Sequence, residues 1–84
     1  MTPRILKDNV LKAKITNLVT KNSGGLKFTE IMIFIMSWAY VNKYVIENGF
    51  TDRVEKVVRG MKSLRTLEYT HEPLKRSEFF VYTP

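Results

Sequence analysis

The basic side chains of segment 51–65 are the best placed in this chain to act on a partner. Apolar residues recur there at helical spacing, with polar and charged residues between them. Ammonium and guanidinium groups bind phosphate oxygens and the acceptor atoms of base edges, and a hydroxyl group can bind either. The candidate contact residues are Arg53, Lys56, Arg59, Lys62 and Ser63. Asp52 and Glu55 lie among them and would repel phosphate or accept from a cytosine amino group. The alternative is a hydrated face without a partner.

Two further groups of basic residues could bind phosphate. Lys75 and Arg76 fall in a predicted loop, where they either touch a polyanion or remain hydrated. Lys7, Lys14 and Lys21 are seven residues apart, so a helix places them in one row. That row indicates secondary phosphate contacts or, as the simpler interpretation, the hydrated side of a helix.

No residue pattern indicates catalysis or a metal site. The chain has no cysteine and His71 is its one histidine, so disulfides and thiolate sites are excluded and no spacing implies a metal ion. The acidic residues show no paired spacing for general acid–base work. Gly24-Gly25 lacks the Lys-Ser/Thr of a phosphate-binding loop. We therefore expect no enzymatic activity, no metal and no cofactor.

The first part of the chain predicts a helix followed by a very short strand. Eighty-four residues, 44% of them hydrophobic, indicate one small domain over residues 1–84. Thr2-Pro3 is a favourable helix start, and Asn22–Gly25 ends the helix at about Lys21. The apolar residues on one side of this helix are Ile5, Leu11, Ile15, Leu18 and Val19. Residues 26–28 then alternate, which predicts a short strand.

A second helix is predicted from Thr29-Glu30 to Val45 or Glu47. Its principal apolar face contains Ile31, Phe34, Ile35, Trp38, Val41 and Val45. The opposite face is also largely apolar and forms a candidate dimer interface of Met32, Ile33, Met36 and Tyr40. A helix that is apolar all round must be covered on two sides, so we expect a homodimer. The apolar segment 31–46 is too short for a membrane span and contains Lys43.

The turn at residues 47–50 leads into the third predicted helix. Gly49 can take a positive φ at no steric cost, which a tight turn between helices often needs. Phe50 can enter the core, and Thr51 can cap the helix that follows, which we expect to reach about Arg65. The residues that should face inward are Val54, Val57, Val58, Met61 and Leu64.

The C-terminal part predicts a β-hairpin. Residues 67–71 and 78–83 alternate between apolar and polar side chains, as strands with one buried face do. The connection 72–77 contains Pro73, which prevents regular pairing there.

This order of elements resembles the winged helix-turn-helix superfamily. Residues 24–31 and 48–51 resemble the corners where that superfamily passes from strand to helix and from helix to helix. The resemblance implies an α+β fold, mainly α, with three helices and a C-terminal hairpin that serves as the wing. It also implies contact with duplex DNA through the third helix and through the wing tip at Lys75 and Arg76.

The charge balance is compatible with this function but unevenly distributed. The net charge is +6 and the isoelectric point about 9.8, which favours a polyanionic partner. Residues 1–28 carry +5, residues 29–50 carry −1 and residues 51–84 carry +2. We predict a small transcriptional regulator that binds double-stranded DNA, located in the cytoplasm or on the nucleoid and typical in size of phage or plasmid regulators. The alternative is a winged helix that dimerises, or binds a polymerase or other protein, without reading DNA sequence.

Overall fold

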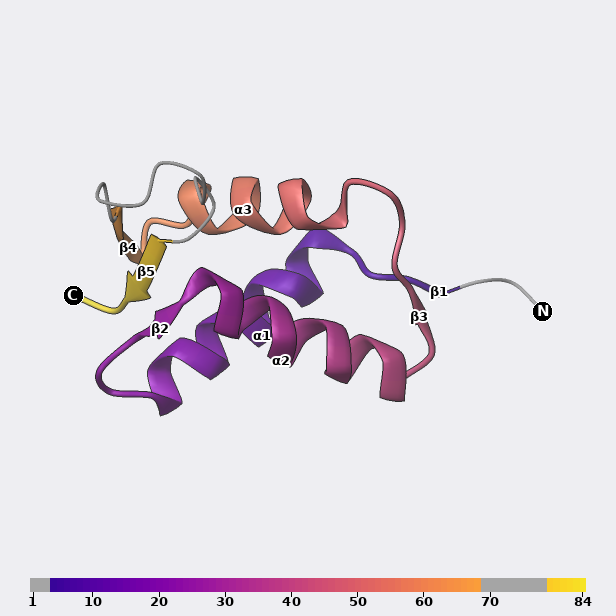
Figure 1. Ribbon diagram of the computed structural model, residues 1–84, viewed down its shortest axis with the longest axis horizontal. Coiled ribbons are helices and arrows are strands. Elements are labelled where there is room, and N and C mark those ends of the chain that lie inside the picture. Colours follow the sequence, from indigo (N-terminus) through magenta and orange to yellow (C-terminus); the bar gives the residue numbers. More distant parts are fainter. Residues whose placement is uncertain (1–3, 69–78) are drawn as a thin grey trace.

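The computed structural model describes residues 4–68 and 79–84 as a small, mainly helical α+β protein measuring 45 × 27 × 20 Å. Three helices pack together, with a small sheet at one end of the molecule and a pair of strands at the other (Figure 1). In chain order the elements are β1 (Arg4–Ile5), α1 (Asp8–Lys21), β2 (Leu26–Lys27), α2 (Phe28–Val41), β3 (Tyr44–Val45), α3 (Phe50–Gly60), β4 (Arg65–Glu68) and β5 (Phe79–Tyr82).

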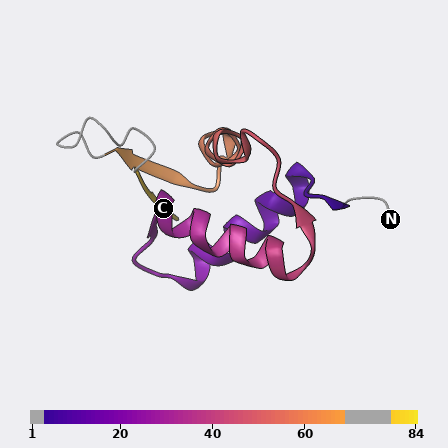
Figure 2. The same cartoon turned by 45° about the vertical axis from the view of Figure 1, so that its right-hand side comes forward.

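The larger sheet has the strand order β2-β5-β4, with both pairings antiparallel. Leu26 lies opposite Val81, and Val81 lies opposite Thr66. The short strand predicted over 26–28 is therefore confirmed at Leu26–Lys27, whereas Phe28 is the first residue of α2. β4 begins at Arg65, two residues earlier than predicted, because α3 ends sooner than expected. The predicted loop 72–77 lies outside the described residues. Figure 2 views α3 nearly along its axis, with the orange strand β4 of this sheet leaving to one side of the helix.

The second sheet was not predicted. β1 pairs in parallel with β3, with Arg4 opposite Tyr44 and Ile5 opposite Val45. The Arg4 guanidinium donates to the Asn42 carbonyl and to the Tyr44 hydroxyl at 2.9 and 3.0 Å. The prediction that residues 4–7 are helical was therefore wrong, while Thr2-Pro3 lies outside the described residues. Both residues of β1 are exposed, so the predicted core residue Ile5 does not enter the core, whereas the following Leu6 is buried.

α2 is shorter than predicted at its C-terminal end. It ends at Val41, and residues 44–45 join the second sheet instead. At its start the Glu30 carboxylate accepts a hydrogen bond from the Lys27 backbone N–H at 3.0 Å. The acidic residue predicted near this helix end is thus confirmed, but Lys27 rather than Thr29 occupies the capping position.

α3 begins one residue before its predicted cap. Gly49 precedes the helix with φ 82°, as predicted, and Phe50 is the first helical residue and is buried. Thr51 therefore lies inside the helix and makes no capping bond. The helix ends at Gly60, about one turn before the predicted end.

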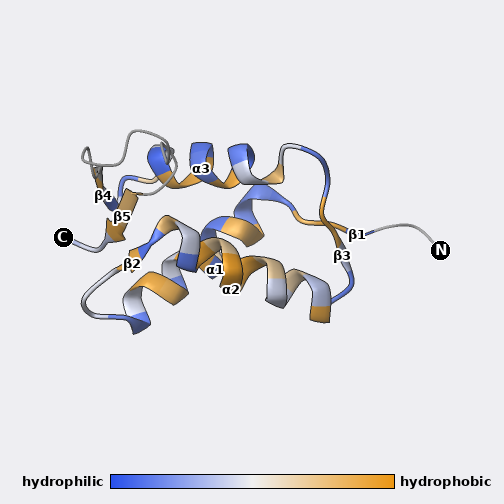
Figure 3. Cartoon of the chain, viewed as in Figure 1, coloured by the Kyte–Doolittle hydropathy of each residue, from blue (hydrophilic) through white to orange (hydrophobic). Residues whose placement is uncertain are grey.

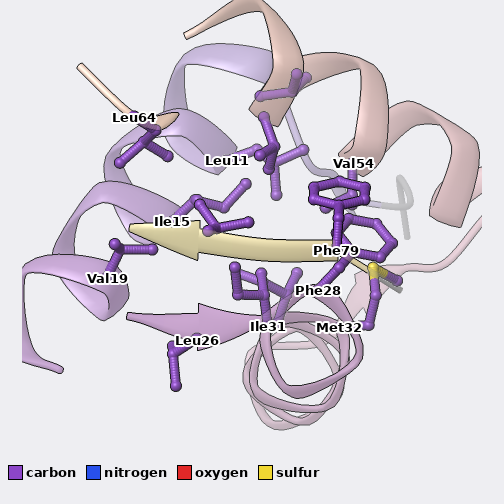
Figure 4. Packing of buried hydrophobic residues seen from close by; sticks show 14 of the residues in the cluster. Leu11, Ile15, Val19, Leu26, Phe28, Ile31, Met32, Val54, Leu64 and Phe79 are labelled. Carbon is purple, nitrogen blue, oxygen red and sulfur yellow. The ribbon is translucent and has the colours of Figure 1, made fainter. Parts of the chain in front are cut away.

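A single hydrophobic cluster joins the three helices to the β2-β5-β4 sheet. The Phe28 and Phe79 rings stack at 4.8 Å between centroids, and side chains from α1, α2 and α3 surround them (Figure 4). Burying an aromatic or aliphatic side chain of this size stabilises a fold by about 1.5–3 kcal/mol. The predicted inward residues Leu11, Ile15 and Val54 are confirmed. This cluster fixes α3 against the rest of the protein and leaves the opposite side of α3 in solvent.

Candidate functional site

Arg53 forms the most connected polar junction among the described residues. Its Nη1 donates to Glu47 Oε1 at 2.7 Å, and its Nε donates to Asp8 Oδ1 at 2.9 Å. Its Nη2 donates to the Leu6 backbone carbonyl. One guanidinium thus joins the start of α1, the β3–α3 connection and the first turn of α3. Arg53 was predicted to contact nucleic acid, but its three donor nitrogens are occupied within the protein.

The charges at this junction stabilise one another. The hydrogen bond from Arg53 is the main cause that lowers the pKa of Glu47 below its ordinary value. The same bond raises the pKa of Arg53, so the guanidinium stays charged. Part of the gain is offset, since Glu47 Oε2 is buried without a hydrogen-bond partner among the residues that the structure describes. The sequence signal that could have indicated the junction is the Glu47–Arg53 pair on either side of the turn.

Arg59 also makes contacts within the fold. Its guanidinium lies 4.5 Å from the centroid of the Phe79 ring and 3.9 Å from the Glu55 carboxylate. A cation above an aromatic face is attracted by the quadrupole of the ring. Arg59 therefore helps to cover the buried Phe79 ring, although part of the arginine side chain remains accessible at the surface.

Lys56, Lys62 and Ser63 are exposed, as their predicted role requires. Lys56 lies at a hollow of about 370 Å³ between α1 and α3, and Lys12 of α1 also lines it. Lys12 was not among the predicted site residues, because its place opposite α3 depends on how the helices pack. Asp8 and Arg53 complete the polar lining of this hollow and are paired with each other.

A second hollow, of about 330 Å³, lies where α3 passes into β4. Arg59, Lys62 and Arg65 contribute its basic side chains. The Arg65 guanidinium donates to the carbonyls of Lys62 and Leu64 at 2.7 and 3.2 Å, so it holds the turn after the helix. Basic residues at this position also interact favourably with the partial negative charge at the C-terminal end of the helix.

The predicted row of lysines on α1 does not form one continuous surface. Lys7 precedes the helix in an extended conformation, and Lys21 is at the last helical position. Between them, the Lys14 ammonium lies 5.3 Å from the centroid of the Trp38 ring and is half-buried at the α1–α2 contact. Lys75 and Arg76 lie outside the described residues, so the structure places only the basic residues of α1, α3 and their connections.

The surface of α2 differs from its predicted pattern. Met32 is buried, whereas Ile33, Met36 and Tyr40 are exposed as the predicted interface requires. Phe34 and Val41, predicted to face inward, are exposed as well. Colouring by hydropathy shows α3 divided into a hydrophilic outer side and a hydrophobic inner side, while hydrophobic residues recur along the length of α2 (Figure 3). The outer surface of α2 is therefore the main apolar surface of the described structure.

The chain has no detectable similarity to known families, curated proteins or solved structures. Within residues 4–68 and 79–84, no three His, Cys, Asp or Glu side chains come together as a metal site would require. No helix in the same ranges is long and apolar enough to cross a membrane.

Proposed function

We propose that this protein is a winged helix that binds duplex DNA through the outer side of α3. The order of its helices and strands supports this, as does a sheet in which β2 pairs with the hairpin strand β5. In such a fold the third helix enters the major groove and the hairpin contacts the flanking backbone. The strongly amphipathic α3, anchored by the core on one side and hydrated on the other, fits that use.

One observation carries the proposal: Lys12 of α1 and Lys56 of α3 are both exposed and line the same hollow. Two ammonium groups on different elements can bind phosphates while the outer residues of α3 approach the bases. Lys62 and Ser63 extend this surface beyond the helix end. Arg53 acts within the proposal as a positioning residue, because it fixes the first turn of α3 against α1.

Binding to duplex DNA at two salt concentrations tests the proposal. A labelled mixed-sequence duplex should show binding by fluorescence anisotropy at low salt, and the affinity should fall steeply as salt rises because bound counterions are released. Replacing Lys12 and Lys56 by Ala together should weaken binding and lower the salt slope by about 2, since each phosphate contact contributes about 1.

Lys21→Ala is the matched control for this experiment. Lys21 is an exposed lysine of the same helix, nine residues from Lys12, which is about 13 Å along a helix axis. Although Lys21 belonged to the predicted lysine row, it does not line the hollow of Lys12 and Lys56, so the control should retain the affinity and the salt slope of the unmodified protein. Absence of duplex binding at low salt would refute the proposal, and equal losses in the control would remove Lys12 and Lys56 from the site.

A second function is favoured by the exposed apolar surface of α2. A winged helix that serves as a dimerisation or protein-binding module needs such a surface and does not need a basic one. In that case the outer side of α3 is simply hydrated, and the anisotropy measurement shows no salt-dependent binding of duplex.

A further inference from the structure

We propose that the outer surface of α2 binds a second copy of this chain. The surface consists of Ile33, Met36 and Tyr40, together with the adjoining Val41 and Ile46, and is called here the α2 stripe. The inference is independent of DNA binding, because the α2 stripe contains no residue of α3 and none of the basic residues assigned above.

The α2 stripe has the geometry of a helix-packing surface. Ile33, Met36 and Tyr40 are spaced i, i+3 and i+7, so they form a row along one side of α2. Beside the row lies a shallow hollow of about 410 Å³ lined by Met36, Ser37, Tyr40, Val41 and Ile46. A row of side chains next to a hollow can receive the same row from another helix. A surface of this kind can pair with itself about a two-fold axis.

The exposed area is the reason to expect a stable complex. Tyr40 is 84% exposed, Val41 75% and Ile33 65%, with smaller exposed fractions at Met36 and Ile46. An aromatic side chain such as Tyr40 presents about 150–250 Å² and an aliphatic one somewhat less, so the exposed fractions of the five residues amount to roughly 600 Å². Monomeric proteins rarely expose contiguous apolar patches larger than a few hundred Å². A standard interface buries about 800 Å² on each partner, so the α2 stripe would form the larger part of such an interface.

The charge distribution favours the α2 stripe over the rest of the surface for contact between two copies. The protein carries a net charge of +6, so two copies repel each other over most of their surfaces. Glu30 is the one charged residue of α2, and none of the five stripe residues is charged. Contact through the α2 stripe therefore buries no charge. A membrane-binding helix typically has Lys and Arg along its polar side, and α2 contains neither.

Sedimentation equilibrium of the whole chain tests the proposal. The unmodified protein should sediment as a dimer at micromolar concentration, and higher salt should strengthen the dimer because it screens repulsion between the copies. Tyr40→Glu and Ile33→Glu change exposed side chains only, so each should preserve the far-UV circular dichroism spectrum. Each should weaken dimerisation by roughly 100-fold, as charges introduced at the centre of an interface do.

Leu67→Glu is the matched control. Leu67 is an exposed apolar residue of β4 with an exposed fraction of 56%, and it does not belong to the α2 stripe. This variant should sediment as the unmodified protein does. The opposite salt dependence separates the two proposals, because salt weakens DNA binding and strengthens the dimer.

Two results would overturn the proposal. One is an unmodified protein that remains monomeric at all accessible concentrations and at both salt concentrations, whether or not it binds vesicles or another protein. The other is a dimer that persists in both α2 variants, which would place the interface elsewhere.

Discussion

α2 and α3 both lie at the surface and both pack one side into the same core, but they present opposite chemistry to solvent. The outer side of α3 carries Asp52, Lys56 and Arg59, whereas the outer side of α2 carries Ile33, Met36 and Tyr40. On α3 the boundary between core and solvent coincides with the boundary between apolar and polar residues. On α2 it does not, because apolar residues lie on both sides of that boundary. This apolar outer side of α2 is the feature on which the proposed contact with a second copy rests.

The largest effect on stability is expected where a buried and an exposed residue of α2 are compared. Ile35 is fully buried and its neighbour Phe34 is 47% exposed. Ile35→Ala should lower the free energy of unfolding by about 2–5 kcal/mol, because it leaves a cavity in the core. Phe34→Ala should cost less than about 1 kcal/mol. Urea denaturation of both variants measures the difference, and equal losses would mean that both sides of α2 are buried.

On α3, the next largest effect should come from Arg53, which bonds to residues of three different segments. Arg53→Met removes the bonds to Glu47, Asp8 and the Leu6 carbonyl, so it should destabilise the fold by about 1–3 kcal/mol. Lys56→Met changes an exposed residue of the same helix and should stay within about 0.5 kcal/mol of the unmodified protein. Thermal denaturation of the pair tests this, and a neutral Arg53→Met would return Arg53 to the set of partner-binding residues.

The same junction should make stability depend on acid pH. The hydrogen bond from Arg53 lowers the pKa of folded Glu47, so the carboxylate stabilises the fold above its ordinary unfolded pKa of about 4.3. This contribution is lost as the pH falls through the folded pKa. Glu47→Gln should therefore be less stable than the unmodified protein near neutral pH and should approach it in acid. In the Arg53→Met background the pH dependence of this difference should largely disappear, and its persistence would contradict the pairing.

The smallest effect concerns the two ends of α3. Gly60 is helical and has no atom within 4 Å of an added Cβ, so Gly60→Ala should stabilise the protein by about 0.5–1 kcal/mol. Gly49 also has open space but takes φ 82°, so Gly49→Ala should destabilise by about 1–2 kcal/mol. Opposite signs in calorimetric melting temperatures are expected. A destabilising Gly60→Ala would contradict the helical geometry at the end of α3.

The sequence predicted burial well where helical spacing alone decides it, and poorly where packing against another element decides it. The inward residues of α3 were predicted well, because its polar and apolar residues separate clearly on a helical wheel. On α2 the wheel placed Phe34 inward and Met32 in the outer interface, and both predictions were wrong, since apolar residues lie all around the helix. Packing against the sheet decides it: Met32 enters the core and Phe34 does not.

The candidate site was predicted in part for the same reason. Lys56, Lys62 and Ser63 needed only helical spacing and a turn to reach solvent. Arg53 is basic like these lysines, but its guanidinium is already bonded to Asp8, which lies 45 residues earlier in the chain. Lys12 was missed because its neighbour Lys56 belongs to another helix. Local patterns predict which residue types face water, whereas tertiary packing decides which of them are already occupied.

The contacts at the start of the chain have a consequence for folding kinetics. Arg4 bonds to a carbonyl 38 residues away and Arg53 bonds to one 47 residues away, so both contacts close long loops. Helices form within about a microsecond, whereas closing so long a loop has a large entropic cost. These bonds should therefore form after the folding transition state. Their loss should accelerate unfolding and leave the refolding rate almost unchanged.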